Sequence, residues 1–319
     1  MTDKRILFFG NNYMDYCTAI RRELEKEIGP TTYCSLEFPR LIRMFRPFGG
    51  ALYARMRYLY HRRQINKLAG QKFDYVYFVH VMQMDISLVR RLKEMFPRAR
   101  FILYYWDSLK THDYREYIPL FDKVFSFDRT DCENDPRLSY LPLFYNEAQF
   151  PPPSGEKDLY DLAYVASITH ERRYHYLTAL REYAQAHRLR LFAYNPVFSK
   201  TYINYFLKNG KLMKGVRWKL ISLDKVYDVF NRSTVIVDFP NNVQSGLSMR
   251  TFETLGMGKK LITCNENIKL EACYSPENVC IISPDDLERI PEDFFRTPAK
   301  KDPAIRQYSL NSWVKHQFS

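Results

Sequence analysis

Short apolar segments alternate with amphipathic helical segments along most of this 319-residue chain, and this alternation most restricts the fold. Lys4 to Gly10 (KRILFFG) is the first apolar run, and a helical pattern from about Cys17 to Ile28 follows a polar loop. The same pattern predicts strands at 33–38, 74–81, 99–106 and 123–127, and a helix at 86–95. Strands that alternate with helices of this length predict a parallel sheet with helices on both faces.

A proline-rich stretch, FPPPSGEKD from Phe150 to Asp158, separates two such patterns. Beyond it we expect strands at 159–167, 189–194, 234–239 and 260–263, and a helix at 226–232, whereas 198–220 shows no clear pattern. The chain is also long for a single core. We therefore expect two doubly wound, Rossmann-like α/β domains, 1–149 and 150–300, with functional loops at the carboxyl ends of the strands, in a cleft between the domains.

The composition narrows the possible partners. A net charge of +12 indicates a polyanionic partner, which could be nucleic acid, an anionic membrane surface or a phosphorylated small molecule. The six cysteines are scattered without a C-x-x-C pair, which disfavours a zinc site and a disulfide framework. No apolar run approaches the roughly eighteen residues of a membrane span, and the N-terminus does not resemble a signal peptide. We expect a cytoplasmic protein.

In the first half, polar side chains follow three predicted strands. Asp15 lies after the first strand, His80 ends the run VYFVH, and Asp107 follows FILYYW. A carboxylate or imidazole at such a place is suited to take a proton from an acceptor hydroxyl. The alternative is that the aspartates cap the following helices and that His80 is half-buried and hydrogen-bonded.

In the second half, Ser167, Thr169, Arg172 and Arg173 surround the start of a predicted helix. The free backbone N–H groups of a helix start attract phosphate, and arginine adds two parallel hydrogen bonds suited to a diphosphate. Capping by Thr169 and a solvated arginine face explain the pattern equally well.

The stretch SGLSMRTFETLGMGKKLITCN, Ser245 to Asn265, is the most specific motif. It predicts a polar loop, a short helix that ends near Gly256 and Gly258, and a strand. Arg250 and Glu253, three residues apart, share a helix face, so they either pair with each other or hold a ligand at the helix start. GMGKK is not a P-loop, because it follows a helix and lacks the serine or threonine.

This order of features resembles the nucleotide-sugar half of glycosyltransferases with the GT-B fold, most closely bacterial exopolysaccharide and lipopolysaccharide enzymes and the CgeB-like group. The resemblance implies that Glu253 binds the ribose hydroxyls of the nucleotide. It places Asp107 and Asp131 on the acceptor side, because FILYYWDS and FDKVFSFDRTD resemble the family's acceptor-side strands. It also implies that YSLNSWVKHQF, within 301–319, is a helix that crosses back to the first domain.

One position departs from the family pattern. Many retaining members carry another glutamate eight residues before the one that corresponds to Glu253. This chain has Ser245 at that position. A neutral hydroxyl does not supply that charge. An inverting enzyme with a base such as Asp107, or a different sugar contact through Gln244 and Ser245, is therefore favoured.

The segment from Phe38 to Lys67 interleaves eight arginines and lysines with aromatic residues and contains no acidic residue. A basic amphipathic helix with aromatic side chains can lie in an anionic membrane interface, and the segment 40–67 would suit a lipid-linked acceptor. A core-facing helix with a basic solvent face is the alternative. No nucleic-acid module is recognisable, and we expect no nucleic-acid partner.

These features together predict a GT-B glycosyltransferase that uses a nucleotide sugar as substrate, with no cofactor or metal, for a glycan or lipid-linked glycan acceptor. Asp107 is the first candidate for the base, Asp15 the second and His80 the third. The predicted donor-binding residues are Ser167, Thr169, Arg172, Gln244, Ser245, Gly246, Leu247, Arg250 and Glu253. A sugar-nucleotide epimerase of the same fold and a basic module that binds nucleic acid or anionic lipid are the alternatives.

Overall fold

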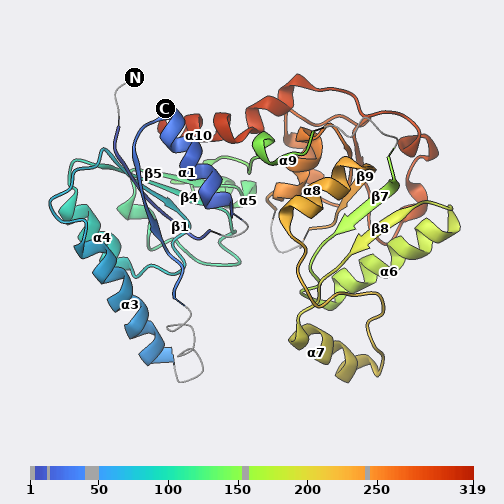
Figure 1. The fold of residues 1–319 in the computed structure, drawn as a ribbon, viewed down its shortest axis with the longest axis horizontal. Coiled ribbons are helices and arrows are strands. Elements are labelled where there is room, and N and C mark those ends of the chain that lie inside the picture. The colour runs from blue at the N-terminus through green and yellow to red at the C-terminus, as the bar shows by residue number, and fades with distance from the viewer. Residues whose placement is uncertain (1–3, 13–14, 40–49, 153–157, 241–244) are drawn as a thin grey trace. The chain divides into compact units, whose positions relative to one another are not determined.

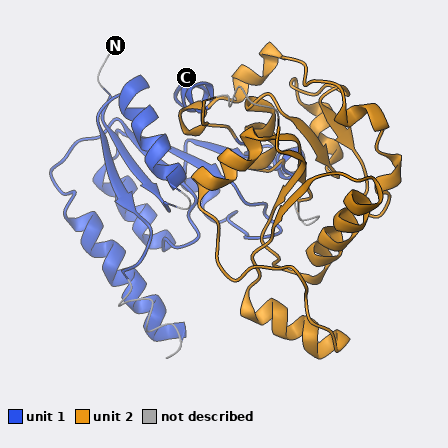
Figure 2. Ribbon diagram, turned by 45° about the vertical axis from the view of Figure 1, so that its right-hand side comes forward, with its two compact units in different colours: residues 1–143, 243–246, 310–319 blue, residues 144–242, 247–309 orange. Residues whose placement is uncertain are grey.

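The structure is a computed structural model that describes residues 4–12, 15–39, 50–152, 158–240 and 245–319. The chain divides into two compact units, residues 1–143, 243–246 and 310–319 in the first and residues 144–242 and 247–309 in the second (Figure 2). The division falls a few residues before the expected boundary at 149/150. The C-terminal helix α10 (Leu310–Phe318) belongs to the first unit.

The first unit is a parallel six-stranded sheet in the order β2-β1-β3-β4-β5-β6 (Figure 1). Its strands are β1 (Ile6–Gly10), β2 (Thr31–Ser35), β3 (Tyr75–Val79), β4 (Arg100–Tyr105), β5 (Lys123–Ser126) and β6 (Ser139–Tyr140). Its helices, besides α10, are α1 (Tyr16–Glu27), α3 (Gly50–Asn66), α4 (Ile86–Met95) and α5 (Arg129–Asn134).

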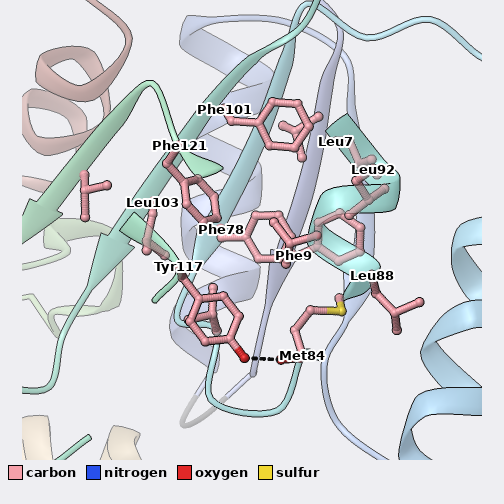
Figure 3. Close-up of a cluster of buried hydrophobic side chains, with 14 of the residues drawn as sticks. Leu7, Phe9, Phe78, Met84, Leu88, Leu92, Phe101, Leu103, Tyr117 and Phe121 are labelled. Atoms are coloured by element: carbon pink, nitrogen blue, oxygen red, sulfur yellow. Dashed lines mark hydrogen bonds between the residues drawn. The ribbon is translucent and has the colours of Figure 1, made fainter. Parts of the chain in front are cut away.

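Alternate residues of these strands serve two cores, because successive side chains of a strand point to opposite faces. Leu7, Phe9 and Phe78 lie on the face covered by α3 and α4, where the rings of Phe9 and Phe78 stack at 4.5 Å (Figure 3). On the other face Tyr77 donates a hydrogen bond to Gln317 of α10 at 2.9 Å, and the ring of Tyr104 packs against that of Trp313. Both faces are buried, which explains why the strands are continuous apolar runs.

The second unit is a parallel five-stranded sheet in the order β11-β10-β9-β7-β8. Its strands are β7 (Tyr160–Val165), β8 (Leu191–Tyr194), β9 (Ser233–Asp238), β10 (Lys260–Thr263) and β11 (Val279–Ile281). Its helices are α6 (Glu171–Ala186), α7 (Ser199–Asn209), α8 (Leu223–Asn231) and α9 (Met249–Gly256). The predicted fold class, two parallel α/β domains, is confirmed.

The predicted elements differ from the observed ones mainly at their ends, whereas β6, β11 and α5 were not predicted. The helix at 86–95 and the strand at 260–263 have the predicted bounds. The strand predicted at 33–38 begins earlier, at Thr31, and the unassigned segment 198–220 contains α7. The predicted linker 150–158 lies partly outside the described residues. No helix among the described residues is both long and apolar enough to cross a bilayer.

Each sheet has one point at which the order of its strands reverses. In the first unit this point lies between β1 and β3, and in the second between β7 and β9. Ligands of open α/β sheets bind outside the carboxyl ends of the strands at such points. Candidate sites therefore lie at the loops after β1 and β3 and at the loops after β7 and β9.

Candidate active site

His80 follows β3 at the reversal point of the first sheet, with a left-handed backbone (φ 76°) that is uncommon outside glycine. Its buried ring accepts a hydrogen bond at Nδ1 from the backbone N–H of Met82, at 3.2 Å. Its Nε2 lies 2.9 Å from Oδ2 of Asp107. Because Nδ1 is the acceptor, the proton of the neutral ring is on Nε2 and is donated to Asp107. His80 therefore orients Asp107, and both of its ring nitrogens are occupied.

Aromatic rings fix the plane of the His80 imidazole. Tyr105 stacks on it with ring centres 4.4 Å apart, and the ring of Tyr105 also stacks with that of His112 at 5.7 Å. The hydroxyl of Tyr105 also hydrogen-bonds Nδ1 of His112. Burial lowers the pKa of His112 from its usual value, with a smaller contribution from His80 in the same direction. The lowered pKa favours the neutral form of His112.

Asp107 combines a buried support with access to solvent. Its side chain is 32% exposed, whereas that of His80 is only 3% exposed. Such a carboxylate can receive a proton from a hydroxyl that approaches from solvent. Of the three candidates for the base, Asp107 has the geometry that best suits the role.

Asp15 lies at the same edge of the sheet, because β1 and β3 are neighbours that pair from Ile6 with Tyr75 to Gly10 with Val79. It is exposed, has a φ of 60° and accepts a hydrogen bond from Asn12 at 3.0 Å. Its carboxylate does not cap α1. Asp15 is thus not the simple helix cap that its position allowed, and its use as a base stays a prediction.

Asp131, which the resemblance placed on the acceptor side, and Asp128 both accept backbone hydrogen bonds within the first unit. Asp131 is buried and accepts a hydrogen bond from the backbone N–H of Leu109 at 2.7 Å, and its pKa is raised by burial. Asp128 begins α5 and accepts a bond from the backbone N–H of Asp131 at 3.2 Å. These bonds join the loop after β4 to the start of α5.

Ser245 and Gly246, predicted to bind the donor, are hydrogen-bonded to Asp128. The backbone N–H of Ser245 donates to Asp128 at 2.8 Å, its hydroxyl donates to the same carboxylate, and the N–H of Gly246 donates at 3.3 Å. A β-carbon at Gly246 would overlap the ring of Phe127, so only glycine fits. Leu247 is buried, and Gln244 lies outside the described residues. A donor contact by these residues stays a prediction.

The four residues predicted to surround a helix start, Ser167, Thr169, Arg172 and Arg173, lie around the start of α6. Arg173 donates to the carbonyl of Ser167 at 3.0 Å, and the guanidinium of Arg172 lies over the ring of Tyr176 at 5.6 Å. Thr169 does not cap the helix; its carbonyl accepts a bond from Thr201 at 3.2 Å. Beside it is a cavity of about 240 Å³ lined by Thr169, His170, Glu171, Thr201, Asn204, Tyr205 and Lys208.

Asp238, at the end of β9, organises the start of α9. It accepts hydrogen bonds from Ser248 at 2.5 Å and from Thr251 at 3.4 Å. Burial raises its pKa, although the Ser248 bond and the positive charges of Arg250 and Arg173 act in the opposite direction. The two arginines therefore lie near the same carboxylate, one from each side of the reversal point between β7 and β9.

Arg250 and Glu253 pair with each other. The buried carboxylate of Glu253 accepts a bond from Arg250 at 3.3 Å and a second, at 2.7 Å, from the hydroxyl of Tyr227. The guanidinium of Arg250 also lies 4.5 Å from the ring centre of Phe230. Glu253 thus fixes Arg250 at the start of α9 (Met249–Gly256), and its contact with a ribose stays a prediction.

Sequence reasoning missed two tyrosines near this site. Tyr164 in β7 and Tyr176 in α6 are both nearly fully buried, and their rings lie 6.0 and 5.5 Å from that of Phe239. Neither hydroxyl has a hydrogen-bond partner in the part of the chain that the structure describes, and Nε of Arg173 also lacks one. A buried polar group without a partner destabilises a fold by about 1–3 kcal/mol, so these groups are candidates for ligand contacts. Tyr164 lies in the strand YDLAYV and Tyr176 in a helix, where aromatic residues are ordinary core residues, so the sequence held no specific signal for either tyrosine.

No group of three or more histidine, cysteine, aspartate or glutamate side chains in the described residues is arranged to hold a metal ion. The positive groups at the second reversal point are arginines.

Neither a protein-family model nor a curated protein sequence matches this chain. Among solved structures, an alpha,alpha-trehalose 6-phosphate synthase from Burkholderia multivorans aligns with a TM-score of 0.60 at 10% identity, over 98% of this chain and 95% of that one. The UDP-GlcNAc 2-epimerase from Neisseria meningitidis bound to UDP-GlcNAc aligns with a TM-score of 0.58 at 10% identity, over 98% of both chains. This chain has the GT-B fold. Identities this low show the fold alone.

Proposed function

We propose that this protein is a glycosyltransferase that moves a sugar from a nucleotide-sugar donor to a hydroxyl of an acceptor. The observation that carries the proposal is the pair of His80 and Asp107 at the reversal point of the first sheet, 2.9 Å apart. A transferase needs a base near the acceptor hydroxyl, and a partly exposed carboxylate on a buried imidazole meets that need. The GT-B fold, shared with a structure solved bound to UDP-GlcNAc, supports a nucleotide sugar as the donor.

In this proposal the second unit binds the donor. Arg172, Arg173 and Arg250 lie at the starts of α6 and α9, where helix dipoles also favour negative charge. Arginines bind phosphate oxygens through two parallel hydrogen bonds and can stabilise the charge that develops on a departing diphosphate. The unpartnered hydroxyls of Tyr164 and Tyr176 are further candidate donors. We therefore propose that transfer does not require a metal ion.

The reaction we propose is a direct displacement with inversion. The acceptor oxygen forms a bond to the anomeric carbon while the bond from that carbon to the diphosphate oxygen breaks. The acceptor proton passes to Asp107, and the electron pair of the broken bond leaves with the nucleoside diphosphate. His80 keeps the Asp107 carboxylate in place through its Nε2–H.

The resemblance to exopolysaccharide and lipopolysaccharide enzymes suggests a glycan or lipid-linked glycan acceptor at the cytoplasmic face of a membrane, in the synthesis of a surface polysaccharide. The basic segment 40–67 was the predicted contact with that membrane. Of this segment the structure describes α3, on which Arg55, Arg62 and Arg63 are exposed. Arg57, in contrast, lies over the rings of Phe38 and Tyr53.

A sugar-nucleotide epimerase is the second candidate, because several of the similar structures are UDP-GlcNAc 2-epimerases. An epimerase converts the donor without an acceptor. A transferase releases nucleoside diphosphate in proportion to the glycosylated acceptor.

The decisive experiment has two stages. A thermal-shift panel of nucleoside diphosphates and nucleotide sugars identifies the donor, since a ligand that binds only the folded state raises the melting temperature. The selected donor is then incubated with and without a panel of glycan acceptors, in EDTA and in magnesium, and the products are separated by mass spectrometry and chromatography. Acceptor-dependent diphosphate release that EDTA does not abolish supports the proposal, whereas an epimerised donor formed without acceptor contradicts it.

A further inference from the structure

The segment from Phe198 to Leu220, which includes α7, is the most exposed apolar part of the described chain. Seven of the twelve large hydrophobic side chains that are exposed in the described residues belong to it, at 45% to 74% exposure. These are Phe198, Ile203, Phe206, Leu207, Leu212, Trp218 and Leu220. Single exposed apolar residues are ordinary, but so many within one short segment favour an interaction surface.

The two faces of α7 have different roles. Tyr202 and Tyr205 pack against the core of the second unit. Ile203, Phe206 and Leu207 follow at i, i+3 and i+4, so they share a second face, which is exposed. Figure 1 shows α7 extending away from the β7–β9 sheet. The helix therefore has one face for the core and one apolar face for solvent.

The segment is firmly attached despite this exposure. After α7 the chain turns at Gly210, which has a left-handed φ of 64°. The backbone N–H of Lys214 then donates to Tyr174 at 2.8 Å, Arg181 donates to the carbonyls of Lys214 and Gly215, and the ring of Trp218 packs on Tyr202 at 4.9 Å. The apolar side chains are thus held in place on a fixed backbone.

The charge of the segment indicates what covers this surface. Between Phe198 and Leu220 there is no acidic residue, and there are six basic ones, Lys200, Lys208, Lys211, Lys214, Arg217 and Lys219. Lys208 pairs with Glu171 at 2.7 Å, but Lys200, Lys211 and Lys214 form no side-chain ion pair with any described residue. Apolar side chains surrounded by unpaired lysines match an anionic lipid surface, whose headgroups meet the charges while the apolar groups enter the acyl boundary. A second copy of this basic segment would instead be repelled.

We propose that residues 198–220 form a membrane-docking surface for anionic lipid bilayers, with Ile203, Phe206, Leu207 and Trp218 inserted at the interface. Aromatic residues such as tryptophan favour this depth of a bilayer. The surface belongs to the second unit and is distinct from the segment 40–67. The inference does not depend on which reaction the protein catalyses.

The first test uses the full chain and vesicles of phosphatidylcholine with or without 30% phosphatidylglycerol, a composition on the order of that of an anionic leaflet. Of the three tryptophans in the chain, Trp313 is buried and Trp106 is half-buried, whereas Trp218 is exposed and serves as the reporter. Anionic vesicles should shift its fluorescence to the blue and cosediment with the protein, and higher salt should weaken both effects. Trp218→Phe should abolish the shift. If wild type binds the vesicles but its fluorescence spectrum does not change, the membrane contact lies elsewhere in the chain.

The second test compares matched variants whose melting temperatures equal that of wild type. Serine at Ile203, Phe206 and Leu207 should weaken vesicle binding about tenfold or more, which corresponds to about 1.4 kcal/mol. Glutamine at Lys200, Lys211 and Lys214 should weaken it similarly at low salt. Glutamine at Arg55, Arg62 and Arg63 of α3 removes the same net charge as the variant at the three lysines, and it should weaken vesicle binding less.

Two further results would overturn the proposal. One is a serine variant that binds vesicles as well as wild type does, or an α3 variant that loses as much vesicle binding as the lysine variant. The other is a wild-type dimer, measured by analytical ultracentrifugation, that becomes a monomer in the serine variant, because the surface would then bind a second copy.

Discussion

His80 donates from Nε2 to Oδ2 of Asp107 across 2.9 Å, and it does so from a backbone conformation that few residues other than glycine adopt. A left-handed conformation costs on the order of 1–3 kcal/mol and persists where surrounding contacts hold it. Here those contacts are the N–H of Met82 and the stacked ring of Tyr105. Strain of this kind is concentrated at functional sites.

Asp107→Asn should reduce turnover by about a hundredfold or more with little change in donor affinity, because it keeps the shape of the side chain but removes the base. Initial rates with a saturating acceptor and a donor titration measure the two effects. His80→Gln should reduce turnover less, since it removes only the orientation of Asp107. Near-normal turnover of the Asp107→Asn protein would indicate that Asp15 is the base or that the reaction uses no protein base.

Glu253→Gln tests whether this residue binds ribose or only supports Arg250. If Glu253 only supports Arg250, the substitution removes the charged acceptor of the hydrogen bonds from Tyr227 and Arg250. The free energy of unfolding should then fall by about 1–3 kcal/mol. If Glu253 also contacts the ribose, the variant should in addition lose the preference for a nucleoside diphosphate over its 2′-deoxy form. Calorimetric titration measures this preference.

Tyr227→Phe is the matched control for Glu253, because it removes the 2.7 Å bond and leaves the carboxylate. It should lower stability and keep the ribose preference. A Glu253→Gln protein that discriminates as well as wild type would show that Glu253 has no contact with the ribose.

Tyr176→Phe removes a buried hydroxyl that has no partner in the described part of the chain. The melting temperature of the free protein should therefore stay the same or rise, since an unsatisfied polar group is deleted. If the hydroxyl binds the ligand, the stabilisation by nucleoside diphosphate should decrease in the same variant. Equal ligand-induced shifts in the variant and wild type would remove Tyr176 from the site.

Gly246→Ala should destabilise the fold by about 1–3 kcal/mol, because its β-carbon would overlap the ring of Phe127. Urea unfolding followed by circular dichroism measures this change. Combining it with Phe127→Leu should recover part of the loss, since the ring is then absent. Additive losses in the double variant would show that the two positions are not in contact.

Glu27 links stability to pH through the C-terminal helix. Hydrogen bonds from Lys315 and Lys26 lower its pKa from 4.5 to about 2, although burial acts in the opposite direction. The unfolded state therefore binds more protons than the folded state between these values. The stability contributed by ionised Glu27 is complete above about pH 4.5 and is lost as the pH falls toward 2.

Glu27→Gln should lower the melting temperature at about pH 6 and reduce the difference between about pH 6 and about pH 3, both measured by calorimetry. Glu25→Gln removes a carboxylate of the same helix that faces Arg21 on the surface, and it should change neither. A pH dependence of Glu27→Gln as steep as that of wild type would show that the pair with Lys315 does not form.

The sequence by itself determined the two parallel sheets, because runs such as ILFFG and YVYFV are apolar on both faces and only a covered sheet buries both. It also identified the strand ends at which Asp107 and His80 lie, since strand ends follow from where the apolar run stops. Local patterns decide these features.

Only the tertiary structure decided which partner each polar side chain has. Ser245 meets Asp128 across 117 residues of sequence, and Glu253 meets Tyr227 across 26, distances over which periodicity carries no information. The same holds for α7, whose apolar face resembles a core face in the sequence but is exposed in the structure. Hydrophobic pattern specifies which residues can be buried, whereas packing between segments that are distant in sequence determines which of them are.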